Sequence, residues 1–285
     1  MVTVIASGLR AARRRWPVAA FLLFVNLAFG LIFTVASWSW LSIALDRALP
    51  TRTLLTDLDV NVFVDLFVHH QGSLRMLMTG GALLAAVFVL FSVWATAGAV
   101  AAVGEEGTLA ECASRGVQLY PKFLCLWFVA SFLHAASIAA SFLIGRALAH
   151  WVAESSAEST FYWATTGSLA LGVFLVFFVA TLHDHARIRV AATDSGVLHA
   201  CAWAVAFVVV REVRALPLAA LLLAIGGGLW LVYQTTGLLI PTTFGPGIAL
   251  SLLCGQILLL GRMFLRVWLL AAETELQRVA ADARS

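Results

Sequence analysis

The chain has 285 residues, of which 62% are hydrophobic and only 12% are charged, and its formal net charge is +3. Soluble globular domains usually carry about 25% charged residues, so this composition excludes an ordinary soluble domain. The small basic excess does not indicate a nucleic-acid partner. We interpret it as a sign of membrane topology and of contact with anionic lipid headgroups.

The apolar residues occur in six long blocks. A bilayer core about 30 Å thick requires roughly 20 apolar residues per helix, and each block reaches that length. Backbone polar groups in lipid must be bonded within their own segment, so each block is predicted to be a transmembrane α-helix. Short alternating strands, as in a membrane barrel, are not indicated. The predicted spans cover approximately residues 17–45, 76–103, 121–149, 161–182, 216–240 and 243–266.

The first block follows three consecutive arginines, Arg13 to Arg15, as the core of a secretory leader would. Its 29 apolar residues exceed the roughly 7–15 of a signal-peptide core. No small-residue cleavage site follows before Asp46. We therefore expect a retained membrane anchor.

Lysine and arginine are unevenly divided among the connections. Fourteen of the 18 lie in the N-terminal arm, the second and fourth connections and the C-terminal end, which share one side of a six-span protein. Basic segments remain in the cytoplasm. Both termini are therefore predicted to be cytoplasmic.

Three of the six prolines occupy matching places before an apolar block. Proline suits the first turn of a helix and disfavours helical geometry in the residue before it. Pro17, Pro121 and Pro217 are each predicted to mark a bend between a cytoplasmic interfacial elbow helix and a span. The predicted elbows cover residues 2–15, 108–120 and 194–214.

Each elbow is predicted to lead into a helical hairpin, so the fold class is an all-α polytopic membrane protein of three hairpins. It would form one domain, 1–285, with pseudo-repeats at about 1–103, 104–190 and 191–285. The long outer connection, 46–75, has two readings. Polar residues at every fourth position between Asp57 and His69 fit a surface helix, whereas the alternation from Leu58 to Val64 fits a strand equally well.

The stretch HDHARIRV follows directly after the fourth span. His183 and His185 are two apart, so on a helix they point about 200° apart and cannot share a metal. Asp184 and Arg187 are three apart, the spacing for a pair across one helical turn. The favoured interpretation is the polar edge of a membrane helix. A sharper alternative pairs Arg262 or Arg266 of the last span with Asp184, or with the acids 105 and 106, tying the hairpin ends together.

Polar residues within the spans are the default functional candidates. His134, Ser137, Ser141 and Gly145 line one face of the third span, and hydroxyl and small residues at such spacing favour close helix packing. No catalytic residue, metal site or cofactor is predicted. The candidate polar and ion-pair positions are Asp184, Arg187, Arg262, Arg266, Asn26 and His134.

The motif D-x-A-R-I at Asp184–Ile188, followed by a long amphipathic elbow and Pro217, resembles a group of six-helix bacterial inner-membrane proteins. The plan is also similar to the membrane domain attached to some glycerophosphodiester phosphodiesterases. The resemblance implies a bacterial plasma-membrane protein. It implies no phosphodiesterase activity, because the sequence of that soluble domain does not occur in this chain.

Three functions are consistent with the sequence. The favoured one is a non-enzymatic scaffold or accessory component with a membrane-protein partner, because polar residues are sparse. The second is a transporter or lipid-handling protein with a cavity near Asn26, His134 and Arg262. The third is an intramembrane enzyme that uses His183 and His185 together with the aspartate between them.

Overall fold

The computed structural model describes residues 1–46, 64, 68, 71–104, 109–153, 158–240 and 245–282. Most of the outer segment 46–75 lies outside these residues, as do Glu105 and Glu106. Within the described part of the chain every regular element is a helix, and six helices are long and apolar enough to span a bilayer. The prediction of an all-α multi-pass membrane fold is confirmed.

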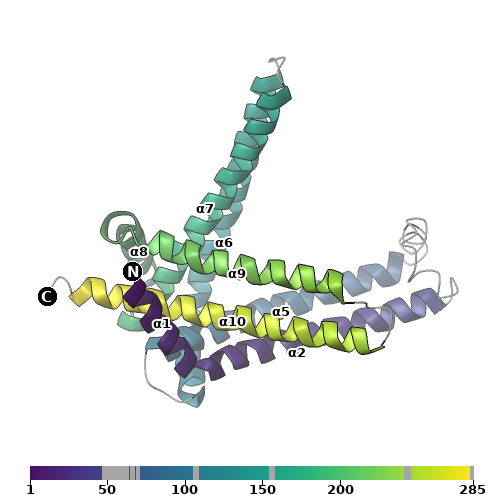
Figure 1. Cartoon of the computed structure of the whole chain (residues 1–285), viewed down its shortest axis with the longest axis horizontal. Helices are drawn as coiled ribbons and strands as arrows, with labels where there is room; N and C mark the ends of the chain where they lie inside the picture. Colours follow the sequence, from purple (N-terminus) through teal and green to yellow (C-terminus); the bar gives the residue numbers. More distant parts are fainter. Residues whose placement is uncertain are drawn as a thin grey trace. The chain divides into compact units, whose positions relative to one another are not determined.

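Short elements lie before the first long helix and between the fourth and fifth long helices (Figure 1). The short elements are α1 (Val2–Arg14), α8 (Val197–Ala206) and the π-helix η1 (Phe207–Arg211). The long helices are α2 (Trp16–Asp46), α5 (Gln71–Gly104), α6 (Leu109–Ala153), α7 (Glu158–Thr193), α9 (Ala215–Leu239) and α10 (Gly245–Asp282).

The chain divides into two compact units. The larger unit contains Met1–Ala20 and Val93–Ser285, and the smaller unit contains Phe21–Ser92. The smaller unit is therefore a hairpin of α2 and the first part of α5. All other helices, with the first turn of α2 and the end of α5, belong to the larger unit.

Two of the three predicted elbows are separate helices. The backbone leaves helical geometry at Arg15, between α1 and α2, and α2 has Pro17 in its first turn. A second break at residues 212–214 separates η1 from α9, which carries Pro217 in its first turn. In both places the proline lies where a helix does not need its backbone N–H.

The elbow predicted before Pro121 is wrong. Helix α6 runs without interruption through Pro121, although an interior proline costs roughly 3 kcal/mol. The turns before the proline pack closely on α5: a Cβ added at Gly98 would lie only 2.9 Å from the carbonyl oxygen of Cys112. Leu119 and Phe123 are buried on either side of the proline. This packing holds both halves in one helix.

Helices α7 and α10 both extend beyond the predicted spans, which ended at 182 and 266. The additional turns pack into two apolar clusters of the larger unit, in which each buried Leu or Phe contributes about 1.5–3 kcal/mol. One cluster joins α5, α6, α7, α8 and α10. The other joins α1, η1, α9 and α10. Hydrophobic burial thus continues the helices past the membrane-length segments.

Helix α1 lies directly on α10 in the second cluster. A Cβ at Gly8 would approach the Ala272 backbone to 2.8 Å, so glycine permits the two helices to meet. The Trp268 indole N–H donates a hydrogen bond to the Ile5 carbonyl oxygen at 3.1 Å. The N-terminal arm is therefore part of the larger unit's core.

The outer parts of α6 and α7 pack through small residues. The Ser141 hydroxyl donates to the Ser168 carbonyl oxygen at 3.3 Å. A Cβ at Gly145 would lie 2.7 Å from Ser168 Oγ, and Gly172 approaches Ser141 similarly closely. The predicted packing face of the third span is confirmed at Ser141 and Gly145.

Candidate functional site at the polar ends of helices α7 and α10

The centre of the site is a carboxylate held by an arginine from another helix. Asp184 of α7 is 5% exposed. Arg266 of α10 donates through both terminal nitrogens, one to each carboxylate oxygen, at 2.6 Å. Paired N–H donors facing two oxygens are the strongest ion-pair geometry that arginine makes. The predicted pair between Arg266 and Asp184 is present, and it joins α7 to α10.

A second guanidinium faces the same carboxylate. Arg187, one turn further along α7, has its terminal nitrogen 3.4 Å from Asp184 Oδ1 and is only 8% exposed. The predicted contact across one turn is therefore also present. Two cations around one anion compensate the charge that burial would otherwise penalise. The polar stretch HDHAR at the end of the fourth predicted span is therefore buried by packing within the protein at Asp184, His185 and Arg187.

The two histidines have different surroundings. His185 is fully buried, with its Nδ1 3.0 Å from Nε2 of Gln277 in α10. Because the glutamine nitrogen donates, Nδ1 accepts and the ring proton is assigned to Nε2. His183 is half-buried and lies on a different side of the helix, as its spacing predicts. The two imidazoles do not converge.

Aromatic side chains connect this site to the elbow. The Arg189 guanidinium lies 4.9 Å from the centre of the Trp203 ring. Trp203 stacks on Phe207 with centroids 4.7 Å apart, and Phe207 lies 5.0 Å from the His185 ring. Phe207 also begins the π-helix, a rare element that is often found at functional sites. The elbow is thereby attached to the end of α7.

The turn after α7 is closed by one lysine. Lys122 Nζ donates to the Asp194 carbonyl oxygen and to its Oδ1, both at 2.7 Å. Asp194 has a φ of 53°, a left-handed conformation that aspartate tolerates better than most residues. The hydrogen bond from Lys122 lowers the pKa of the Asp194 carboxyl, and its positive charge adds to the effect.

Glu273 is the acid that sequence reasoning missed. It is fully buried in α10. It stands seven residues after Arg266, which places both on the same face of the helix two turns apart. That spacing was visible in the sequence, but a predicted span ending at residue 266 left the glutamate outside any packed segment.

The remaining candidates take no part in the ion pairs of Asp184. Arg262 is exposed and makes no ion pair within the described residues, whereas its alternative partners, residues 105 and 106, lie outside them. His134 is half-buried in α6, and its Nδ1 has no hydrogen-bond partner in the described part of the chain. The Asn26 amide donates to the Leu22 carbonyl oxygen of its own helix at 2.7 Å.

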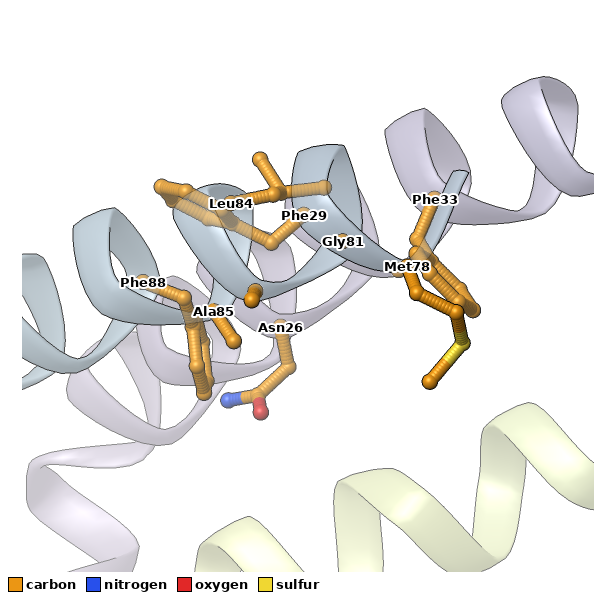
Figure 2. Close-up of a pocket in the computed structure, with 10 residues that line it drawn as sticks. Asn26, Phe29, Phe33, Met78, Gly81, Leu84, Ala85 and Phe88 are labelled. Carbon is orange, nitrogen blue, oxygen red and sulfur yellow. The ribbon is translucent and has the colours of Figure 1, made fainter. Parts of the chain in front are cut away.

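The smaller unit contains an apolar groove of about 580 Å³ between α2 and α5. Asn26, Ala85 and Phe88 lie together at one part of it, and Phe33 and Met78 lie at another (Figure 2). Asn26 is its polar member, and the other lining residues are glycine, alanine, leucine, methionine and phenylalanine. Its composition suits an acyl chain or an apolar side chain more than a polar solute.

The polar cluster (Asp184, His185, Arg187, Arg266, Glu273 and Gln277) is arranged for helix attachment. Both oxygens of its aspartate accept hydrogen bonds from arginine, which leaves that group poorly placed as a base or nucleophile. Among the described residues, no three His, Cys, Asp or Glu side chains are grouped as metal ligands. Comparison with known proteins found no matching family, curated protein or solved structure.

Proposed function

We propose that this protein is a non-enzymatic component of a bacterial inner membrane, a scaffold or accessory subunit that binds another membrane protein. The observation that supports this proposal is that Asp184, the acid at the centre of the polar cluster, is bound by arginines of the same protein. It bonds to Arg266 and Arg187, so the charges join helices together. The outer surfaces of the membrane helices carry apolar side chains instead.

The partner surface is proposed to lie on the outer parts of α6 and α7. Phe142 is 68% exposed and Trp163 is 77% exposed, although the two helices pack on each other nearby through Ser141 and Ser168. Lipid solvates apolar side chains well, so a partner helix would be held by shape and interhelical hydrogen bonds. The test is therefore whether another protein packs closely against this face.

Photo-crosslinking in intact membranes tests the proposal. A crosslinking amino acid at Phe142 is expected to give one discrete protein–protein adduct. The matched control is Ser141, whose side chain contacts α7 and is expected to give only intramolecular crosslinks. Adducts with lipid alone at Phe142 would contradict a partner on this surface.

The groove of the smaller unit supports a second candidate, a transporter or lipid-handling protein. In a variant without its four native cysteines, Ala85→Cys would place a thiol on the lining of the groove. Rapid labelling of this thiol by a membrane-impermeant maleimide would indicate a water-filled path and favour transport. Leu169→Cys, on an exposed apolar position of α7, is the lipid-facing control. Arg13→Cys is the water-facing control, so the labelling is done in opened membranes, where the reagent reaches both sides.

We also propose that both termini face the cytoplasm. Arg10, Arg13 and Arg14 are exposed on α1, where they are suited to contact the anionic lipid headgroups of the inner leaflet. A fluorescent protein fused after Ser285 is expected to be bright, and a phosphatase that requires the periplasm is expected to be inactive there. The reverse pair of results would overturn this orientation.

A further inference from the structure

Glu273 differs from the other buried acids of the described residues. Asp184 is bonded by Arg266, and Glu212 is bonded by Arg214, with one contact at 2.8 Å. Glu273 is 0% exposed, yet both of its carboxyl oxygens lack a hydrogen-bond donor within the described part of the chain. It is a buried carboxyl group without a hydrogen-bond partner among the residues that the structure describes.

The charged and titratable groups of α7 and α10 near Glu273 are already engaged. Arg266 directs both terminal nitrogens at Asp184. Gln277, one turn after Glu273, donates to the His185 ring and to the His185 carbonyl oxygen. The closest formal charge on α7 is therefore the Asp184 carboxylate, which has the same sign as an ionised glutamate and would repel it.

The elements that share the second apolar cluster with α10 bring no cation to Glu273. Helix α1 meets α10 through Gly8 and Ala272, and its arginines at 10, 13 and 14 are exposed. The buried residues that η1 and α9 contribute to this cluster are apolar: Phe207, Val208, Ala215, Leu218 and Leu222.

Isolated burial of a charge is far more costly than burial of a neutral polar group. A glutamate in these surroundings avoids that cost by retaining its proton. We propose that Glu273 is a proton-binding site, occupied in the folded protein as the neutral carboxylic acid, and that loss of its proton loosens α10 from α1 and α7. This goes beyond the proposed scaffold function, because it gives the packing of α10 on α1 and α7 two states that differ by one proton on Glu273.

The two acids of the cluster would then have opposite states. Asp184 is ionised because its oxygens meet arginine, and Glu273 is neutral because apolar residues surround it. Environments that separate two neighbouring carboxyl groups in this way are a recognised means of holding one as base and one as acid. Ionisation of the second acid would add a negative charge that Arg266, already bound to Asp184, does not neutralise.

Thermal unfolding in a mild detergent tests the proposal. Glutamate in an unfolded chain loses its proton near pH 4.3, so a folded state that retains it loses stability as the pH rises above that value. Glu273→Gln cannot ionise and avoids this loss. At pH 8 we expect it to melt about 3 °C or more above the wild type, and the gap is expected to close toward pH 5. Glu275→Gln is the control, because Glu275 is 32% exposed and lies 3.9 Å from Arg278; it should follow the wild type.

Infrared spectroscopy provides a readout on the wild type itself, which does not depend on the stability of any variant. In a detergent without ester groups, the wild type at pH 8 is expected to show the C=O stretching band of a protonated carboxyl group, and Glu273→Gln is expected to lack it. The proposal is overturned if the wild type shows no such band. It is also overturned if Glu273→Gln is less stable than the wild type by the same amount at pH 5 and at pH 8.

Discussion

The polar cluster and the α2–α5 hairpin hold their helices together in different ways. In the polar cluster, Asp184 accepts two short hydrogen bonds from Arg266. In the hairpin, Phe29 of α2 contacts Phe88 and Phe91 of α5, with ring centroids 5.2 and 5.8 Å apart, and a groove remains beside them. Removal of one ion-pair partner leaves a buried charge, whereas removal of a ring in an apolar medium loses only its packing. Removal of one side chain is therefore expected to lower the free energy of unfolding more in the polar cluster than in the hairpin.

The largest effect is expected for the ion pair. Asp184→Ala should lower the free energy of unfolding by about 3 kcal/mol, the lower end for a broken buried pair, because the Arg266 side chain is still 35% exposed. Arg266→Ala should cost a similar amount. The double variant should be no less stable than the worse single variant, because either single substitution already breaks the bond between Asp184 and Arg266.

Chemical or thermal unfolding of the four proteins in the same detergent measures this coupling. Arg262→Ala is the matched control, because Arg262 is exposed and one helical turn from Arg266. It should be within about 0.5 kcal/mol of the wild type. Additive losses in the double variant, or an Arg262→Ala loss as large as that of Arg266→Ala, would contradict the pairing.

A smaller effect is expected in the hairpin. Phe29→Ala removes two ring contacts, each of the kind worth about 0.5–1.5 kcal/mol beyond buried area. Detergent or lipid replaces part of the lost apolar contact, so we expect a total loss of about 1 kcal/mol. The same unfolding measurement tests it. A loss equal to that of Asp184→Ala would remove the contrast between the two regions.

The smallest effect is expected for the exposed pair of Lys122 and Asp194. The pKa of the Asp194 carboxyl is lowered, so its contribution is present above about pH 4, where the unfolded aspartate is ionised, and is lost as the pH falls further. Asp194→Asn keeps a residue that tolerates positive φ. It should melt slightly below the wild type at pH 6 and no longer below it at pH 3. An equal gap at both values would assign the effect to the backbone instead.

The sequence indicated some parts of the site and missed others for identifiable reasons. The three-residue spacing predicted the contact of Arg187 with Asp184, because that geometry is local to one helix. The Arg266 partner was one of several alternatives, since pairing across helices depends on how they pack. Lys122 and Asp194 are 72 positions apart, and no local pattern could have joined them. The bend expected at Pro121 was wrong because packing on α5 outweighed the local preference of proline.

The sequence by itself determined that this is an all-α membrane protein with six bilayer-length apolar helices, because those features follow from hydrophobic length and from backbone bonding within each segment. Only the tertiary structure decided that α7 and α10 continue past their membrane-length segments, that the aspartate of HDHAR is covered, and that Glu273 is buried without a donor. Burial is a property of what packs around a residue, and that is fixed by contacts between helices far apart in the chain.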